Sequence, residues 1–468
     1  MTSLGVNNYG YDLNGDVYDG ADNYLTGQIG PKKPVFGGAY VQDRMEYENL
    51  IINAGLRYDY INTDNISFVD PLHPEYSIDF NTQEVLPAGL VETPSFSSIS
   101  PRLGFSFPIT DVTVFHAQYG KFVQQTRLRD IYLGMYAISY NLQGKFFIGT
   151  PVGYNVRPTR TTQYEIGFTQ QIGDFASFDI TGFYKDIQDQ VVYRQQKTGS
   201  EGAPSPYPAY ALLTNGDFAT TKGVEVSFNM RRVERFRING SISFQDARGT
   251  GSYPNGQAGI VGAPLDGVTV FTPQYVTPLD YNRPLSGNLN VDYRFGKGDG
   301  GPIFQELGAS LLFLFGSGHP YTQGEGKGNN TGSLEGDSRF RSPTEPLNAS
   351  LTPATFQVDL RVDKTVNLFD QLNMNVYVYV INLFDTRNVQ NVFLRTGSAT
   401  DDGYLSDYNL GGQLAEQNGP EFVALYNAIN IDYYQAYQRA GGQNQGAAGS
   451  SFLFGPPRQI RLGIRLEY

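Results

Sequence analysis

The amino-acid sequence lacks cysteine and tryptophan, and only 17% of its 468 residues are charged, against roughly 25% in ordinary soluble domains. The absence of cysteine excludes disulfide scaffolds, cysteine-rich zinc sites and thiol catalysis. No apolar run approaches the ~20 residues of a membrane-spanning helix, which excludes a helical membrane protein. The net charge is −12 and no basic run occurs, so no nucleic acid is expected as a partner.

The sequence also lacks a recognisable secretory signal, because residues 1–20 contain neither a basic n-region nor an apolar h-region. Met1 is therefore not expected to be the start of the precursor. The numbering is instead expected to begin inside a larger natural chain.

What the sequence has in abundance is a two-residue alternation of apolar and polar side chains. From 235 to 245, the even positions carry phenylalanine, isoleucine or glycine, and the odd positions carry arginine, asparagine, serine or glutamine. Segments 223–231, 356–363 and 460–467 repeat the pattern. In a β-strand this alternation places one face against an apolar medium and the other against water.

The alternating runs predict about thirteen strands, each near the ~9–11 residues that cross a bilayer when tilted. Tyrosine and phenylalanine cluster near the strand ends, as at Tyr58, Phe107 and Tyr184, where a membrane protein has its aromatic girdle. The strands are expected near 36–45, 50–60, 98–107, 112–121, 161–171, 176–187, 222–231, 235–246, 284–295, 304–315, 355–366, 371–382 and 458–467.

The connections between these strands alternate between short and long. A soluble β-sandwich could explain one alternating strand, but it would have both connection lengths at both ends. Short periplasmic turns and long extracellular loops are typical of a bacterial outer-membrane β-barrel, which the sequence therefore predicts. In the last loop, the apolar spacing from 420 to 440 predicts one or two short helices. The long loops are expected at 61–97, 122–160, 188–221, 247–283, 316–354 and 383–457.

Thirteen strands are an odd number, whereas single-chain bacterial barrels have even numbers. An open sheet would also leave two unpaired edges in hydrocarbon, where each unsatisfied peptide group costs several kcal/mol. The all-β region 36–468 is therefore expected to be the C-terminal part of a larger transmembrane antiparallel β-barrel. Residues 1–35, rich in glycine, asparagine and aspartate, are expected to form an extracellular loop region. The remaining strands would come from an upstream part of the precursor or from a partner chain.

Several segments resemble the barrel of TonB-dependent outer-membrane receptors. They include GAYVQDRMEYENLIINAGLRYDY at 38–60, SPRLGFSFPITDVTVFHAQYGKF at 100–122 and TKGVEVSFNMRR at 221–232. FLFGSGHPYT at 313–322 and PPRQIRLGIRLEY at 456–468 look most like the Oar-like branch of this family, which bears a carboxypeptidase-regulatory domain. The resemblance covers residues 36–468.

The resemblance implies a 22-stranded barrel with an N-terminal plug, in which the thirteen strands here are similar to the last thirteen. Such receptors lie in the bacterial outer membrane and take up a ligand too large or too scarce for porins, such as a metal chelate, glycan or peptide. TonB, with ExbB and ExbD, drives them. No plug or TonB box lies in these residues, so TonB would act through the missing plug. The alternative is a non-transporting structural or adhesion protein that displays large surface loops.

Few residues stand out as candidate sites. Asp12, Asn14 and Asp16 have the odd spacing of the first half of a calcium loop, although Asn23 stands where the last carboxylate belongs, so an ordinary acidic loop also fits. The terminal Tyr468 matches the aromatic end that barrels present to the barrel assembly machinery, and also suits a girdle position. Membrane lipid or lipopolysaccharide is a further expected partner.

No enzyme chemistry is predicted, because His73, His116 and His319 lie in different segments and no metalloprotease, serine-hydrolase or P-loop motif occurs. Apart from calcium, no cofactor is expected. The inward strand positions carry charged side chains, which are expected to line a wet interior and to contact the plug. They are Arg57, Asp59, Arg102, Glu165, Glu225, Arg231, Arg237, Asp292, Arg294, Asp359, Arg361, Asp363, Arg461 and Arg465.

Overall fold

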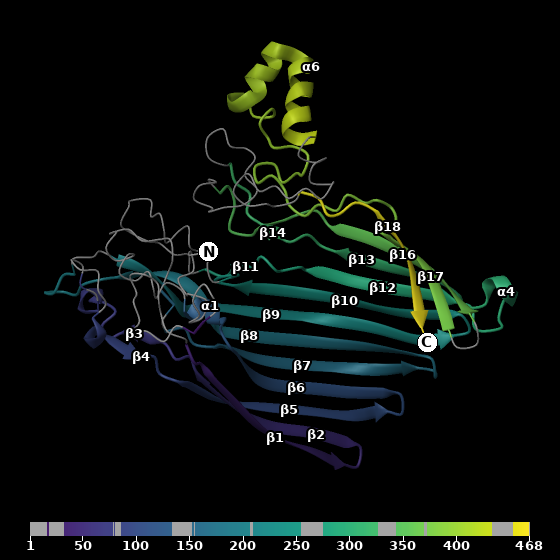
Figure 1. Ribbon diagram of the computed structural model, residues 1–468, viewed down its shortest axis with the longest axis horizontal. Helices are drawn as coiled ribbons and strands as arrows, with labels where there is room; N and C mark the ends of the chain where they lie inside the picture. Colours follow the sequence, from purple (N-terminus) through teal and green to yellow (C-terminus); the bar gives the residue numbers. More distant parts are fainter. Residues whose placement is uncertain are drawn as a thin grey trace.

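The fold is one large antiparallel sheet, seen in the computed structural model of the chain (Figure 1). The structure describes residues 16–17, 32–77, 79, 86–132, 152–153, 155–205, 209–253, 275–325, 343–368, 372–432 and 453–467. Within them, thirteen strands follow one another across the sheet in chain order. They are β1 (Val35–Tyr47), β2 (Leu50–Asn62), β5 (Phe96–Thr110), β6 (Thr113–Gln124), β7 (Thr159–Ile172), β8 (Ala176–Lys197), β9 (Ala209–Val233), β10 (Phe236–Gly249), β12 (Leu285–Arg294), β13 (Leu307–Gly316), β16 (Thr355–Leu368), β17 (Leu372–Ile381) and β18 (Gln459–Glu467).

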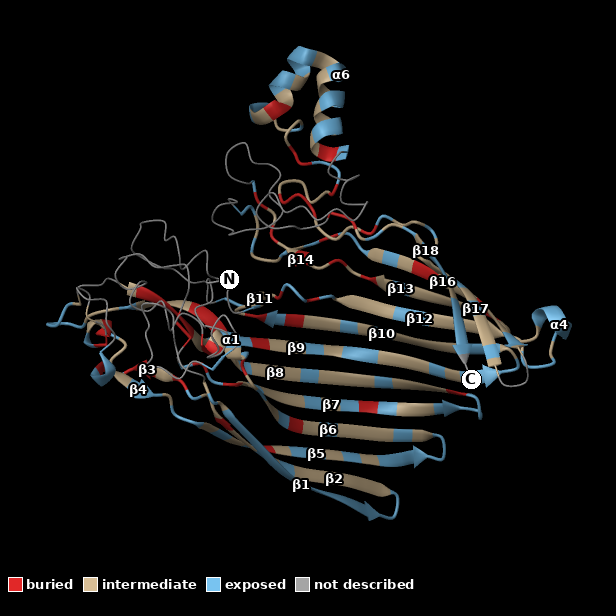
Figure 2. Ribbon diagram, viewed as in Figure 1, coloured by how far each residue is buried: buried red, intermediate tan, exposed pale blue. Residues whose placement is uncertain are grey.

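The strands confirm the prediction made from the alternation, because every predicted run forms a strand and each strand pairs with the next one. Large apolar side chains such as Ile166, Phe244 and Ile464 are exposed on the outer face. Figure 2 shows strands that are mainly exposed or half-buried, with many of the buried residues near the long connections. The apolar side chains of the sheet therefore face outward and do not form the central core that a soluble protein would have.

Short and long connections alternate as predicted, except that the β8–β9 connection is reduced to 198–208 and is no longer than the β12–β13 connection at 295–306. Glu48 and Glu234 lie in two-residue turns and have positive φ, 50° and 54°, which the tight hairpin turn between twisted strands requires. Gly173, with φ 51°, serves the β7–β8 turn. The β12–β13 turn contains the short helix α4 (Gly301–Phe304), so β13 begins at Leu307 rather than at the expected 304.

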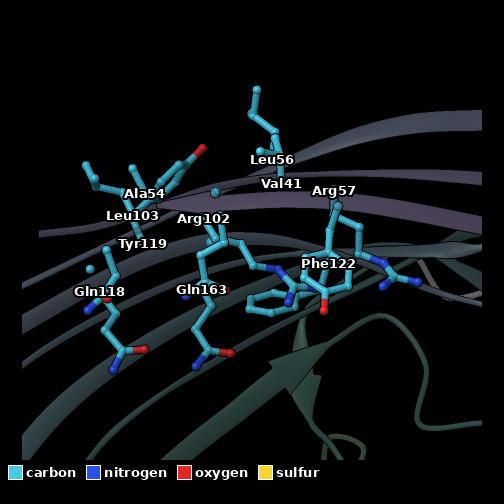
Figure 3. Close-up of a pocket in the computed structure, with 16 residues that line it drawn as sticks. Val41, Ala54, Leu56, Arg57, Arg102, Leu103, Gln118, Tyr119, Phe122 and Gln163 are labelled. Carbon is cyan, nitrogen blue, oxygen red and sulfur yellow. The ribbon is translucent and has the colours of Figure 1, made fainter. Parts of the chain in front are cut away.

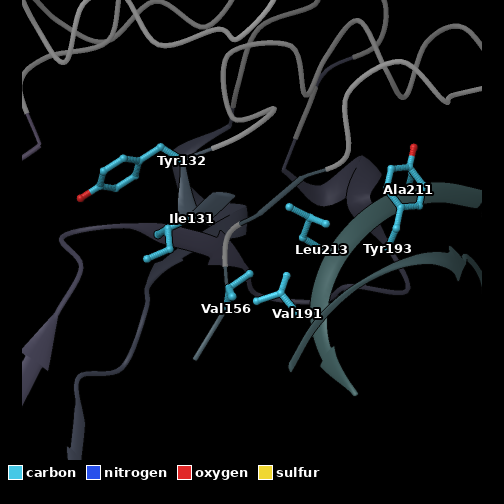
Figure 4. Close-up of a cluster of buried hydrophobic side chains, with 7 residues drawn as sticks. All are labelled: Ile131, Tyr132, Val156, Val191, Tyr193, Ala211 and Leu213. Atoms are coloured by element: carbon cyan, nitrogen blue, oxygen red, sulfur yellow. The ribbon is translucent and has the colours of Figure 1, made fainter. Parts of the chain in front are cut away.

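The stretch 188–221 corrects the prediction of a long loop. β8 continues to Lys197 and β9 begins at Ala209, so these strands form a hairpin that extends well past the ~9–11 residues of a membrane crossing. Its consecutive side chains are buried on both faces, so the extension does not show the alternation of a half-exposed strand. The side chains of one of these faces pack in a cluster that we call the hairpin core (Figure 4). It consists of Ile131, Tyr132, Val156, Val191, Tyr193, Ala211 and Leu213.

The other long connections carry short elements of their own. Helix α6 (Gln413–Asn427) projects beyond the sheet (Figure 1) and bends at Gly419, where φ is 71°, just before Pro420. None of the described helices combines the length and the apolar character needed to cross a membrane. The remaining elements are β3 (Ile66–Phe68), β4 (Leu90–Glu92), β11 (Thr277–Pro278), β14 (Pro320–Tyr321), β15 (Ser350–Leu351), α1 (Leu128–Ile131), 3-10 helices Pro74–Tyr76 and Pro87–Gly89, and π-helical turns Tyr408–Gly412 and Ala428–Asp432.

The sheet is open within the described residues. β1 pairs only with β2, and β18 pairs only with β17. All thirteen residues of β1 are exposed, and so are the large apolar side chains of Ile460, Leu462 and Leu466 on β18. Each edge therefore presents a row of peptide N–H and C=O groups that could pair with another strand.

Candidate binding hollow on the inner face

The register between strands shows which side chains share the inner face. Directly opposed residues of neighbouring antiparallel strands lie on the same face. Gly55 opposes Arg102, Arg102 opposes Gly120, and Gly120 opposes Gln163. Followed strand by strand, the register places the predicted inward charges, from Arg57 on β2 to Arg465 on β18, on this one face. The sheet therefore has a polar inner face and an apolar outer face.

A network of ion pairs and hydrogen bonds joins β12, β16 and β17 on the inner face. Arg294 donates two hydrogen bonds to Asp363, Nη1 to Oδ2 at 2.9 Å and Nη2 to Oδ1 at 2.8 Å, and Asn375 donates a third at 2.9 Å. Arg361 Nε lies 3.7 Å from Asp363 Oδ1, and its guanidinium lies 4.5 Å from the centre of the Tyr377 ring. Because the Asp363 side chain is only 5% exposed, these donors replace the water that would otherwise solvate its charge.

A hollow of about 680 Å³, here called the inner hollow, opens across β1, β2, β5, β6 and β7. Arg102, Gln118, Phe122 and Gln163 project to one side of the sheet there, and Leu56 projects to the other (Figure 3). The floor of the hollow is low at Gly55 and Gly104, which have no side chain. At Gly120 the Phe122 ring lies above the backbone, 2.9 Å from where a Cβ atom would be.

The walls of the inner hollow offer hydrogen-bond donors beside an aromatic ring. The Arg102 guanidinium lies 4.8 Å from the centre of the Phe122 ring. Asp59 holds Arg57 in place through Nε at 2.9 Å and Nη2 at 2.8 Å. Amide and guanidinium groups of this kind bind hydroxyl, carbonyl or carboxylate oxygens. These donors beside the ring suit binding of a polar ligand. The described residues contain no group of three His, Asp or Glu side chains that could hold a metal ion.

At the long-connection end, polar contacts join the tip of the β8–β9 hairpin to the β2–β5 connection. His73 lies 2.9 Å from Glu75 through Nδ1 and 3.5 Å from the Ser200 hydroxyl through Nε2. Ser205 donates to the other Glu75 oxygen at 2.7 Å. The backbone N–H of Gly199 donates to the Leu72 carbonyl at 2.7 Å, so the two segments form one platform.

Burial also shifts titratable groups on α1 and β9, close to this end of the sheet. It raises the pKa of Tyr132 to about 12, with a smaller contribution from the nearby Asp64 charge. It also raises the pKa of Asp130, against the charges of Arg127 and Arg129, and the pKa of Asp217, against the hydrogen bond from Thr250 and the charge of Arg194. The Asp217 carboxylate keeps a hydrogen bond from the Thr250 hydroxyl at 3.0 Å.

Only some of the residues that the sequence suggests as sites lie within the described part of the chain. Asp12, Asn14 and Tyr468 lie outside the described residues, whereas Asp16 is described and exposed. The calcium loop and the assembly signal therefore stay predictions. The three histidines each have a polar neighbour in a different part of the fold: His73 beside Glu75, His116 beside the Thr181 hydroxyl at 3.0 Å, and His319 beside Thr352.

The uncharged residues of the inner hollow were missed from the sequence. Gln42, Asn53, Gln118 and Gln163 occupy inward positions of the alternation, so their facing was predictable. Charge alone does not distinguish them, because their side chains are neutral amides. What the pattern of one strand could not reveal is that Gly55 and Gly120 lie on either side of Arg102, because that depends on the register.

An antiparallel sheet with an apolar outer face, a polar inner face, and short turns at one end with long connections at the other is the wall of a membrane β-barrel. The chain belongs to the TonB-dependent receptor-like β-barrel family, whose model matches residues 2–383. Membership places it in the bacterial outer membrane. No curated protein matches the chain.

Solved structures similar to the chain include outer-membrane transporters. The copper transporter OprC is 13% identical, with 92% of this chain and 48% of that chain covered and a TM-score of 0.46. The FrpB iron transporter from Neisseria meningitidis is 14% identical, with 78% and 44% covered and a TM-score of 0.47. The outer membrane transporter YddB from Escherichia coli is 13% identical, with 77% and 51% covered and a TM-score of 0.44. The chain spans about half the length of these structures.

Proposed function

We propose that this chain is the C-terminal part of the wall of an outer-membrane uptake receptor. The observation that carries the proposal is the polar inner face with its hollow, held in a sheet whose outer face is apolar. A wall built only to anchor surface loops has no need of glycine-floored space and hydrogen-bond donors inside. The ligand we propose is one too scarce or too large for porins: a metal chelate, a glycan or a peptide.

We infer that the complete barrel has 22 strands and encloses a plug, as the family resemblance implies. The open edges at β1 and β18 support this inference, because unpaired peptide groups in hydrocarbon are costly. The further strands would belong to the same precursor or to a partner chain, and the plug would contact TonB. The Oar-like branch, the role of Tyr468 toward the assembly machinery and a calcium ion at Asp12, Asn14 and Asp16 belong to this proposal as well.

A complementation experiment tests transport. Cells that lack the gene are complemented with the natural full-length protein and grown on ferric chelates, glycans or peptides as the limiting nutrient, with and without TonB. We expect a growth advantage on one nutrient class, lost when TonB is absent. Arg102→Ala, which removes a donor from the inner hollow, should lower ligand binding measured on isolated outer membranes.

The second candidate is a non-transporting structural or adhesion protein. It is favoured by the hairpin core and the contacts around His73, because the outer connections have their own packed structure. In that case, growth would be independent of TonB on every nutrient. Deletion of the hairpin tip, residues 198–205, would instead abolish attachment of cells to a surface, and Arg102→Ala would leave it unchanged.

A further inference from the structure

A serine, a histidine and a glutamate lie in line where the tip of the β8–β9 hairpin meets the β2–β5 connection. His73 Nδ1 lies 2.9 Å from Glu75 Oε1, and His73 Nε2 lies 3.5 Å from Ser200 Oγ. We call these three residues the hairpin triad. Ser200 follows His73 by 127 positions in the chain, so no local sequence motif reveals the arrangement.

The hydrogen-bond partners of His73 fix the tautomer of its ring. An ionised Glu75 carboxylate can only accept, so Nδ1 carries the hydrogen, and Nε2 of the neutral ring presents its lone pair to the Ser200 hydroxyl. Ser205 donates to the second Glu75 oxygen at 2.7 Å and holds the carboxylate in place. A nucleophile, a base and an orienting acid in this order activate serine in hydrolases, where the contact between nucleophile and base is often longer without substrate.

The base of the hairpin triad is buried, whereas its nucleophile is exposed. His73 is 6% exposed, and its ring stacks on the Tyr76 ring with 5.1 Å between the centroids and 17° between the planes. The hydrogen bond from the Gly199 N–H to the Leu72 carbonyl fixes the backbone beside both groups. Ser200 itself is exposed at the tip. The base is therefore held in place while a substrate can reach the hydroxyl.

The turn that carries Ser200 also offers hydrogen-bond donors. Ser200 and Ala203 exchange two backbone hydrogen bonds, of 2.9 Å and 3.0 Å, and Gly199 and Gly202 have positive φ, 77° and 83°. The N–H groups of Glu201 and Gly202, at the tip of this turn, have no acceptor within the described part of the chain. A Cβ atom at Gly202 would meet no atom within 4 Å, so the space there is open. Two N–H groups next to the nucleophile are thus available to a developing oxyanion.

We propose that the hairpin triad hydrolyses carboxylic esters at the long-connection end of the sheet. Ser200 Oγ bonds to the ester carbonyl carbon, its proton passes to His73 Nε2, and the carbonyl electron pair moves onto oxygen. The carbonyl then re-forms, and the bond to the alcohol oxygen breaks as that oxygen takes the proton from His73. A water molecule, deprotonated by His73 in the same way, releases the acid and regenerates Ser200. Glu75 is a positioning residue, because it acts only through His73.

The surroundings of the hairpin triad favour an ester with a short acyl chain. Leu72 and Tyr76, on either side of His73 in the chain, are 39% and 57% exposed and provide apolar contacts for such a chain. An ester is the expected class because an alcohol leaves more readily than an amine does. This activity goes beyond ligand uptake and is independent of what the inner hollow binds.

A fluorophosphonate tests the nucleophile, because only an activated serine displaces its fluoride. The purified full-length protein in detergent is treated with the reagent, and mass spectrometry of its peptides locates the adduct. We expect an adduct on Ser200 in the wild type and none in Ser200→Ala or His73→Gln. Ser95→Ala, which removes an exposed serine of the β2–β5 connection, is the matched control and should keep the adduct. A folded wild-type protein that shows no adduct on Ser200 would overturn the proposal without reference to any variant.

Hydrolysis of p-nitrophenyl butyrate by the same preparations tests turnover. Ser200→Ala and His73→Gln should each lower kcat about a hundredfold or more, since each removes the activated nucleophile or its base. Glu75→Gln should lower kcat and leave KM unchanged, because the glutamate orients the histidine and does not contact the ester. Heat-modifiable mobility on gels and the protease resistance of the hairpin show whether each variant is folded. Wild-type hydrolysis by a folded Ser200→Ala protein would mean that these contacts only hold the platform together.

Discussion

Among single residues, the inner-face charges differ most in how far they depend on their partners. Asp363 is nearly buried and relies on Arg294, which donates two of its hydrogen bonds. Arg44 and Glu46 also form an ion pair, at 2.7 Å, but both side chains are about 60% exposed and remain solvated. An ion pair of the first kind leaves an unsatisfied group when one partner is removed, and one of the second kind does not.

We therefore predict that Arg294→Ala destabilises the barrel by about 1–3 kcal/mol, because the Asp363 carboxylate loses its main donor. The measurement is the temperature at which the folded band disappears on an SDS gel. Arg44→Ala is the control, with an expected effect of about 0–1 kcal/mol. Equal shifts for the two variants would contradict the role given to Arg294.

Asp217 gives the hairpin a pH dependence of known sign. Burial raises its pKa above the ordinary value near 4, so the folded hairpin binds the proton more tightly than the unfolded one does. Below the pKa of the unfolded state, the carboxyl group is protonated in both states and does not lower the free energy of unfolding. As the pH rises from there to the pKa of the folded state, the free energy of unfolding falls. Stability of the extended hairpin should accordingly fall as the pH rises from about 4.

We expect Asp217→Asn to slow proteolysis of the hairpin on intact cells at pH 7, because the amide avoids the buried charge and can still accept from the Thr250 hydroxyl. The difference from the wild type should shrink as the pH falls toward about 4. Cleavage rates at pH 7 and pH 5, with a protease active at both, provide the measurement. A wild-type hairpin that is more resistant at pH 7 than at pH 5 would show that the sign is wrong.

Among the elements, the extended β8–β9 hairpin depends on its own apolar cluster. Leu213 is 4% exposed within the hairpin core, whereas Leu351 on β15 is 45% exposed. Leu213→Ala should cost the hairpin about 2–5 kcal/mol locally, and Leu351→Ala almost nothing. Limited proteolysis of intact cells should then cut the Leu213→Ala hairpin faster, while the gel shift on heating stays unchanged. Loss of the whole folded band instead would mean that the hairpin core also supports the barrel.

The elements also show what the sequence can predict. A strand with one face against lipid and the other against water can be predicted from its sequence, because its side chains alternate between apolar and polar, as in 235–245. Val191, Val192 and Tyr193 escape that rule since they are all buried, and a strand covered on both faces loses the alternation. The inward facing of Arg294 and Asp363 follows from the pattern. Their bidentate pairing does not, because it requires the register between strands almost seventy residues apart.

For the whole molecule, the orientation in the membrane follows from the unequal ends of the sheet. The chain has no cysteine, so a thiol reagent can label it only at a cysteine introduced by substitution. On intact cells, a membrane-impermeant thiol reagent should label Glu416→Cys on α6 and spare Lys297→Cys in the β12–β13 turn. Both should react after the outer membrane is permeabilised. Labelling of Lys297→Cys on intact cells would reverse the topology.

The two open edges lead to a second prediction for the whole molecule. Residues 1–468 refolded alone in detergent should give a heterogeneous, heat-labile or aggregated product, because β1 and β18 have no further partner within the described sheet. Size-exclusion chromatography and protease resistance measure this. A monodisperse, protease-resistant monomer would show that these edges close on each other, and that the inference of further strands is wrong.

The length of the β8–β9 hairpin has a mechanical consequence. Its ladder runs from the pair Ala176–Met230 to the pair Lys197–Ala209, interrupted only by register shifts between Ile187 and Val191. Each regular part of this ladder resists bending in the plane of its hydrogen bonds, so we expect the hairpin to move as a stiff arm that pivots at the irregular step. A force on the tip, from a ligand or a neighbouring molecule at the cell surface, would reach the wall as a torque on β7 and β10 instead of being absorbed by a slack loop.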